Sequence, residues 1–241
     1  MVPRLYTSQP LSSSVVDLSK EQAHYLRNVL RRSVGDTVLL FNPDDGEYEA
    51  TISTLDKKSA QVEVQKQTHP PKAEADLWLL FAPLKKTATD FVIEKGTELG
   101  VTKFYPVITV RTQTQKIRDD RLQANAIEAA EQTERLSIPK VQELTKLSTL
   151  LASWSADRTL FYGDESHASP PVVSGLENVT GPVAFLVGPE GGFSVDELQF
   201  LQELPFTQGV SLGPRILRAD TAALSMLACY QSLKGDWISP I

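Results

Sequence analysis

Two segments of this 241-residue chain combine glycine, proline and charged residues in patterns that could do chemistry. The first is GPEGGFS (188–194), which follows the apolar run VAFLV (183–187). Ser194 and Glu197 are spaced as in a helix capping box, so we expect strand, glycine loop and helix in that order. Such a loop lets the backbone approach a ligand at the carboxyl edge of a parallel sheet, although a tight turn before a capped helix has the same pattern. The chain contains neither the G-x-G-x-x-G dinucleotide pattern nor a P-loop.

The second segment is LGPRILRADTA (212–222), in which two arginines bracket an apolar pair just before an expected long apolar helix. Asp220, near the start of that helix, interacts favourably with the helix dipole, which is sufficient reason for its presence. Arg218 is different, because a cation at a helix N-terminus opposes the dipole. The position of Arg218 therefore predicts an anionic partner.

Charged residues are unevenly distributed along the chain. The formal net charge of −6 argues against a protein that binds nucleic acid over its whole surface. Residues 76–118 nevertheless hold seven Lys or Arg against four Asp or Glu, and a second basic cluster contains Arg27, Arg31 and Arg32. These two patches are candidates for local RNA contact, and solvated faces are the simpler alternative.

The first 70 residues predict a small, mostly β domain. A capping box at Ser19 and Gln22 begins a short amphipathic helix over 20–31. Three half-buried strands are expected after it, over 37–42, 47–53 and 61–66. The sequence HPPK (69–72) breaks the pattern and predicts a linker, so we place one domain over 1–70 and a second over 71–241.

From residue 75 onward the pattern alternates between strand and helix. Strands are expected over 76–83, 103–109, 158–162 and 183–187. Helices are expected over 88–100, 121–136, 195–204 and 220–234. Alternation of this kind predicts an α/β domain with a mostly parallel sheet and helices on both of its faces.

The composition narrows the class of protein further. With 41% hydrophobic residues the chain can bury a core without staples. The single cysteine, Cys229, excludes a disulfide framework and is expected to be inert; with three scattered histidines it cannot form a zinc site of the usual kind, so no metal is expected. No apolar run approaches the ~20 residues of a membrane span and no signal-peptide pattern is present, so we expect a soluble, cytoplasmic protein with no membrane partner.

The two loop motifs, in this order and spacing, resemble those of the RsmE family of 16S rRNA uridine-N3 methyltransferases, which belong to the SPOUT superfamily of S-adenosylmethionine (SAM) enzymes. Residues 24–52 are similar to the family's PUA-like RNA-binding domain, EKGTELGV (94–101) to one of its helices, and EQTERLSIP (131–139) to its E-Q-[ST]-x-R-x-x-x-P segment. The resemblance covers almost the whole chain. It implies a small N-terminal PUA-like β-barrel domain and a C-terminal SPOUT α/β domain with a trefoil knot.

The resemblance also implies which residues do the work. In the family the SAM cofactor is held by the two loops, and the matching positions are Gly188, Glu190, Gly191, Leu212, Gly213, Ile216 and Leu217. Glycines would make room for the adenosine, and Leu and Ile would line a slot for its base. Arg218 is expected to be catalytic, stabilising the anion left when the uridine N3 proton departs to a carboxylate or water.

The partners implied are 16S rRNA or the small ribosomal subunit, and a second copy of the chain. Phosphate contacts to the RNA are expected from Arg27, Arg31, Arg32, Lys85 and Lys86. The helix that begins near residue 220 has more apolar residues than one buried face needs, so we expect part of it to form a homodimer interface.

Three positions depart from the family pattern. Gly96 stands where Ala is more usual, Asp220 where Glu is commoner, and Val110 where a Glu usually precedes the residue that is Arg111 here. The changes at positions 96 and 220 are tolerable. The loss of the Glu at position 110 means that no catalytic role is assigned to that position.

Two other functions are compatible with the sequence. A SPOUT methyltransferase of another specificity, such as a ribose 2′-O or tRNA enzyme, shares the loop chemistry but should lack this N-terminal unit. A non-catalytic RNA-binding protein would have kept the fold and lost the reaction.

Overall fold

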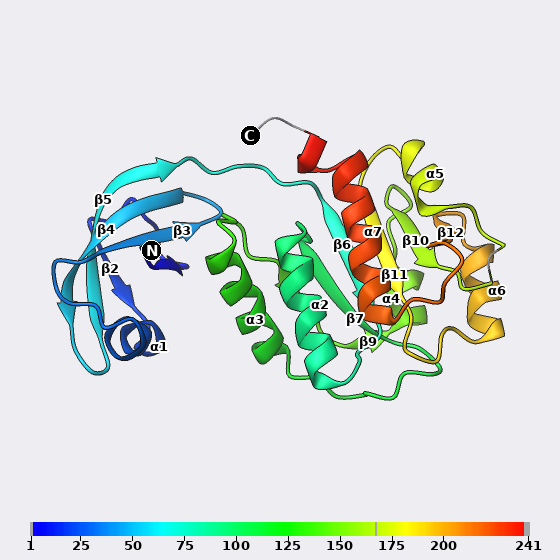
Figure 1. The fold of residues 1–241 in the computed structure, drawn as a ribbon, viewed down its shortest axis with the longest axis horizontal. Helices are drawn as coiled ribbons and strands as arrows, with labels where there is room; N and C mark the ends of the chain where they lie inside the picture. Colours follow the sequence, from blue (N-terminus) through cyan, green and yellow to red (C-terminus); the bar gives the residue numbers. More distant parts are fainter. Residues whose placement is uncertain (1, 167, 239–241) are drawn as a thin grey trace. The chain divides into compact units, whose positions relative to one another are not determined.

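A computed structural model describes residues 2–166 and 168–238, and Figure 1 shows the chain coloured along its sequence. The chain divides into two compact units. The first extends to Ala73 and includes Ala130–Ile138, and the second contains Glu74–Ala129 and the described residues from Pro139 onward. The segment Ala130–Ile138, which the sequence assigns to the second domain, thus packs with the first.

The N-terminal unit is built on a five-stranded sheet with the order β1-β3-β4-β5-β2. Its strands are β1 (Arg4–Tyr6), β2 (Val15–Leu18), β3 (Thr37–Asn42), β4 (Gly46–Leu55) and β5 (Ala60–His69). β1 runs parallel to β3 and the other pairs are antiparallel. Among the described residues β1 and β2 are the two edges, so the predicted small β domain is present and its sheet is an open half-barrel.

The predicted helix over 20–31 is irregular. Its first part is α1 (Lys20–His24), and the predicted capping box is confirmed: Ser19 accepts from Gln22 N while Gln22 bonds back to Ser19 N. The chain then widens into a π-helical turn, η1 (Tyr25–Val29). Arg31 follows in the left-handed region with φ +54°, which ends the helix.

The second unit contains a parallel sheet with the order β12-β10-β11-β6-β7-β8, with β9 also pairing with β7. The strands are β6 (Leu77–Phe81), β7 (Lys103–Ile108), β8 (Lys140–Val141), β9 (Thr145–Lys146), β10 (Thr159–Gly163), β11 (Val183–Val187) and β12 (Thr207–Val210). Every recorded pair in this sheet is parallel, as the strand–helix alternation predicts.

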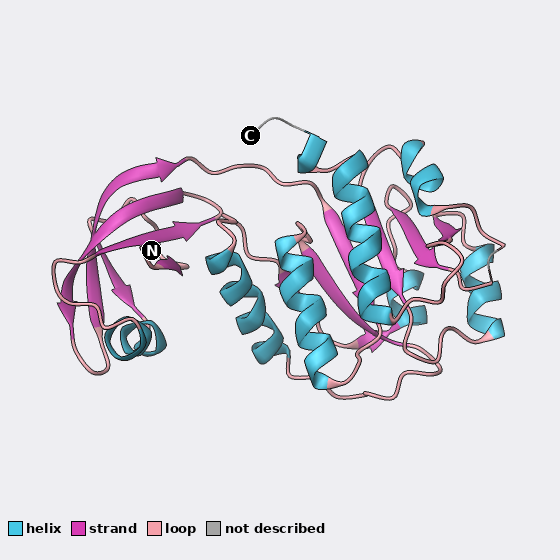
Figure 2. Cartoon of the chain, in the orientation of Figure 1, coloured by secondary structure: helices cyan, strands magenta, loops and turns pink. Residues whose placement is uncertain are grey.

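Helices cover both faces of this sheet (Figure 2). They are α2 (Lys86–Glu98), α3 (Asp119–Gln132), α4 (Leu147–Ala152), α5 (Val172–Glu177), α6 (Val195–Glu203) and α7 (Ala219–Leu233), followed by a short 3-10 turn, η2 (Asp236–Ile238). Successive strand side chains point to opposite faces. Leu79 of β6 therefore packs in one apolar cluster with residues of α2, α3, α5 and α7, and its neighbour Leu80 packs in another with residues of α4 and α6.

Several boundaries differ from the predicted ones. α3 is expected to reach residue 136 but ends at Gln132, and the chain turns at Glu134 with φ +59°. The pattern also misses the short elements β1, β2, β8, β9, β12, α4 and α5, which offer too few residues for a period to show. The trefoil knot stays a prediction. Across the described ranges no helix is long and apolar enough to cross a bilayer.

Candidate active site

Five loops leave one edge of the second unit's sheet, because parallel strands end at the same side. They follow β6, β7, β10, β11 and β12. The two motifs singled out in the sequence are among these loops: GPEGGFS follows β11, and LGPRILR connects β12 to α7. The fold therefore brings the two motifs to one edge, separated in the sheet only by β10.

The GPEGGFS loop is held firmly at both ends. Gly192 N donates to Pro189 O at 2.9 Å, which closes a tight turn. The predicted capping box at the start of α6 is confirmed, with Ser194 accepting from Glu197 N and the Glu197 carboxylate accepting from Ser194 N. The other Glu197 oxygen accepts from Val110 N at 2.8 Å, so this carboxylate ties the loop to the one after β7.

A second tie joins the same two loops. Arg111 donates through Nη1 to Gly191 O at 2.7 Å. Position 110, where the family pattern has Glu, contributes only its backbone, and the Val110 side chain is exposed. The loop after β7 therefore acts on the glycine loop through Arg111 and a main-chain amide rather than through a carboxylate of its own.

The LGPRILR loop is anchored at its start and open further along. Ser211 pairs with the backbone of the loop before α5, donating to Pro170 O and accepting from Val172 N. Leu212 and Leu217 are half-buried, whereas the Ile216 side chain is 74% exposed. Ile216 is therefore an uncovered apolar side chain between two partly covered ones.

Glycine is favoured at different positions of the two loops for different physical reasons. A Cβ at Gly188 would lie 3.1 Å from the Phe193 ring, so internal packing already favours glycine there. Gly213 has φ +96° with open space around a Cβ, so its backbone conformation favours glycine. At Gly191 a Cβ would meet only the Arg111 side chain, at the ordinary distance of 3.5 Å. The protein itself thus needs no glycine at 191, which fits a requirement imposed by a bound ligand.

Arg218 and Glu190 meet where the two motifs converge. Arg218 is the N-cap residue of α7 and makes no capping hydrogen bond with its side chain. Its Nη2 lies 3.9 Å from Glu190 Oε1, and the side chains are 79% and 44% exposed. The anionic partner predicted for Arg218 is therefore in part a carboxylate of the chain itself, held at a distance too long for a hydrogen bond.

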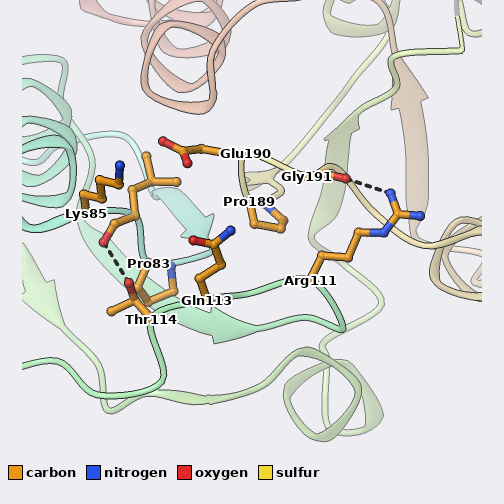
Figure 3. Close-up of a pocket in the computed structure, with 9 residues that line it drawn as sticks. Pro83, Lys85, Arg111, Gln113, Thr114, Pro189, Glu190 and Gly191 are labelled. Carbon is orange, nitrogen blue, oxygen red and sulfur yellow. Dashed lines mark hydrogen bonds between the residues drawn. The ribbon is translucent and has the colours of Figure 1, made fainter.

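A pocket lies beside this pair, on the β6 and β7 side of the glycine loop (Figure 3). The empty volume in and at the mouth of the pocket is about 290 Å³, part of which is open to solvent. Its lining residues come from three loops: Pro83, Leu84, Lys85, Arg111, Gln113, Thr114, Pro189, Glu190 and Gly191. Lys85 is the N-cap residue of α2, so it adds a second cation that opposes a helix dipole at this edge.

The structure brings together some predicted site residues and not others. The positions predicted to bind SAM lie along the carboxyl edge, as do Arg218 and Lys85, and Lys86 is exposed at the first position of α2. The arginines Arg27, Arg31 and Arg32 belong to the N-terminal unit, where Arg27 and Arg31 are exposed and Arg32 is half-buried. Cys229 is half-buried in α7, and burial raises the pKa of its thiol, which opposes formation of a nucleophilic thiolate.

Sequence reasoning missed the pocket residues from the loop after β7. Gln113 and Thr114 carry no glycine pattern that marks them. A usable signal existed, because any polar residue just after a strand of a parallel sheet lies at the ligand-binding edge. Within the described ranges no group of three or more His, Cys, Asp or Glu could hold a metal ion.

Known proteins resemble this chain along nearly its whole length. Residues 71–231 match the RNA methyltransferase domain family, and residues 18–65 match the RNA methyltransferase PUA domain family. Ribosomal RNA small subunit methyltransferase E of Rickettsia conorii is 34% identical in an alignment of 231 positions that covers 93% of each chain. Its counterpart from Bacillus subtilis is 29% identical, covering 91% of this chain and 92% of that protein.

A solved structure gives the same result. The crystal structure of ribosomal RNA small subunit methyltransferase E from Neisseria gonorrhoeae bound to S-adenosyl methionine superposes with a TM-score of 0.87 and is 30% identical. The match covers 98% of this chain and all of that one. Together with the convergent loops at the carboxyl edge, these similarities show that the chain belongs to the ribosomal RNA small subunit methyltransferase E family.

Proposed function

We propose that this protein transfers a methyl group from SAM to N3 of a uridine in 16S rRNA. Family membership supports SAM-dependent methylation of ribosomal RNA. The observation that carries the assignment of the site is the approach of Arg218 to Glu190, at 3.9 Å, where two loops meet beside a pocket. Nitrogen is favoured over uridine C5, because methylation at C5 usually needs a cysteine nucleophile and Cys229 lies in the middle of a helix.

The cofactor would be held by backbone groups of the two loops. The residues proposed to contact it are Gly188, Glu190, Gly191, Leu212, Gly213, Ile216 and Leu217. The open backbone at Gly191 and the uncovered Ile216 side chain support this placement. When bound, SAM supplies a methyl group on a positively charged sulfur, which makes the methyl carbon electrophilic.

The chain's own residues would make the nucleophile. An imide N–H such as uridine N3–H is a weak acid, so a negative charge develops on the base as the proton leaves. The Arg218 guanidinium, placed at the head of α7, would stabilise that charge in the manner of an oxyanion donor. Positioning of the base against the methyl group would contribute further to the rate.

RNA contact would be divided between the two units. In the N-terminal unit the exposed Arg27 and Arg31 are proposed to contact phosphates, with Arg32 beside them, and in the second unit Lys85 and Lys86. We also propose a homodimer in the cytoplasm, where ribosomal RNA is made. Leu224, a half-buried apolar residue of α7, supports a further partner for that helix.

Two measurements test this function. A calorimetric titration with SAM should show binding; its absence would leave an RNA-binding adaptor. Reverse transcription on rRNA from a strain lacking the gene should lose one strong stop, because N3 methylation blocks Watson–Crick pairing and ribose 2′-O methylation does not. An unchanged stop pattern with a lost 2′-O methyl group would assign the protein another specificity.

A further inference from the structure

The carboxyl edge carries several carboxylates, and their hydrogen bonds separate them by role. Both Glu197 oxygens accept backbone amides, from Val110 and Ser194. The buried Asp164 accepts from the backbone and hydroxyl of Ser166 and from the Ser169 hydroxyl. These two carboxylates are committed to holding loops, so neither is placed to accept a proton from a substrate.

Glu190 is placed differently. Its side chain extends over the pocket from the loop after β11, toward the segment that contains Lys85 (Figure 3). No hydrogen bond to its carboxylate is recorded from any residue in the described ranges, and the ion pair that it forms with Arg218 is 3.9 Å long. Its lone pairs are therefore available to a ligand, and half-exposure lets it exchange a proton with solvent.

The rest of the pocket complements one edge of uracil. Uracil presents the sequence O2, N3–H and O4, which is an acceptor, a donor and an acceptor. Lys85 and Gln113 supply donors, and Glu190 is the acceptor among the charged groups that line the pocket. Cytosine carries a lone pair at N3, which would face the Glu190 carboxylate unfavourably, so the same arrangement selects uracil over cytosine.

From this arrangement we infer that the Glu190 side chain accepts the N3 proton of the target uridine, which binds in the pocket bounded by Lys85, Arg111 and Gln113. The inference rests on the proposed function and identifies the proton acceptor that it requires. The N3–H bond breaks, the proton passes to a Glu190 carboxylate oxygen, and the electron pair stays on N3. Arg218 and the pocket donors then stabilise the negative charge shared by N3, O2 and O4. The proton on Glu190 leaves to water.

Substitution of Glu190 by Gln tests the inference, because it keeps the shape of the side chain and removes the base. The assay uses purified protein, SAM and small ribosomal subunits that lack the modification. In this assay E190Q should lower kcat at neutral pH by about 10²–10³-fold. SAM affinity measured by calorimetry should stay within about twofold, because the cofactor is proposed to contact the backbone of residue 190. The matched control is Glu165→Gln, which removes a carboxylate from the same edge outside the pocket and should keep kcat within about twofold.

The pH profile separates a proton acceptor from a structural residue. The kcat of E190Q should rise with pH and approach that of the unsubstituted protein, since hydroxide then removes the imide proton. Formate should restore part of the activity of Glu190→Ala by replacing the missing carboxylate. An equal loss at every pH, or no loss, would overturn the inference while leaving the function intact, provided that the unsubstituted protein forms N3-methyluridine. Absence of that product from the unsubstituted protein would overturn both.

Discussion

The Arg4–Glu47 pair of the N-terminal unit and the Arg218–Glu190 pair of the second unit use the same chemical groups under opposite conditions. Arg4 Nε lies 2.5 Å from Glu47 Oε2, and the two side chains are 6% and 5% exposed. Arg4 also donates to the carbonyls of Ala130 and Arg135 and stacks 3.6 Å above the Phe41 ring. Arg218 and Glu190 are 3.9 Å apart and largely exposed.

The environment of each carboxylate explains the difference. Burial raises the pKa of Glu47, but hydrogen bonds from Arg4, Thr68 and His69 outweigh it and leave that pKa below its usual value. A buried pair of this kind is stable only while every charge is satisfied. Charged groups with a full set of hydrogen-bond partners, such as Arg4 and Glu47, stabilise the fold. Charged groups without such partners, such as Arg218 and Glu190 at the sheet edge, remain available to a ligand.

Removing one member of the buried pair should give the largest effect on stability. Arg4→Ala leaves Glu47 buried without its cation and releases the segment Ala130–Ile138, so we expect a loss of about 3–5 kcal/mol in the free energy of unfolding of this unit. Chemical denaturation of the full chain measures it. Arg118→Ala is the control, because it breaks the exposed Arg118–Asp120 pair and should leave the free energy of unfolding almost unchanged. Equal losses in the two variants would remove the distinction.

Arg218→Ala should leave stability unchanged and impair turnover. If the guanidinium stabilises the uridine anion, kcat should fall by about 10²–10³-fold. The KM for RNA should change much less, because the interaction forms mainly in the transition state. Higher pH should partly restore kcat. A variant that keeps its kcat and loses RNA affinity would show that Arg218 is a phosphate clamp.

Gly191→Val should weaken SAM binding at least tenfold, or about 1.4 kcal/mol, without unfolding the chain. The added side chain would stand beside Arg111 on the loop whose backbone is proposed to hold the cofactor. Calorimetry measures the affinity, and Gly191→Ala serves as the graded control, since its Cβ meets protein atoms only at ordinary distances. Unchanged affinity in the Val variant would remove this loop from the cofactor site.

The smallest effect is expected from the basic cluster of the N-terminal unit. Arg27→Ala with Arg31→Ala should weaken RNA binding and reduce the slope of log affinity against log salt by about 0.7–0.9 for each lost phosphate contact. Lys57→Ala with Lys58→Ala removes the same charge from the exposed turn between β4 and β5 and should leave the slope unchanged. SAM affinity should not respond to either change. Identical slopes in the two double variants would mean that Arg27 and Arg31 only form a solvated helix end.

Features with local determinants could be predicted from the sequence. Both predicted capping boxes are confirmed. They could be predicted because a capping box is formed by a serine and a Gln or Glu only three residues apart. The strand VAFLV and the glycine loop after it are also where the pattern places them. The confirmed parallel sheet then brings the two motifs to the same edge without further information.

Features that depend on residues far apart in the chain, or on details of backbone geometry, could not be predicted from the sequence. The helical period over 20–31 does not reveal the i to i+5 bond from Leu30 N to Tyr25 O that makes the turn π-helical. No local pattern indicates that Arg4 is buried, and only the folded chain shows that the carbonyls it binds, those of Ala130 and Arg135, lie more than 120 residues away. Gly96, a departure from the family pattern, is explained in the same way, because a Cβ there would lie 2.7 Å from the Phe104 ring.

The central claim is that the protein methylates uridine at N3 in a site formed by the loops that carry Arg218 and Glu190. Nucleoside analysis tests this claim most directly. Purified protein, SAM with an isotopically labelled methyl group and small ribosomal subunits from a strain lacking the gene would be incubated, and the digested RNA analysed by mass spectrometry. The account predicts labelled N3-methyluridine, reduced at least a hundredfold in initial rate with Arg218→Ala. Label in any other nucleoside, or the same rate of N3-methyluridine formation with the Arg218 variant, would contradict it.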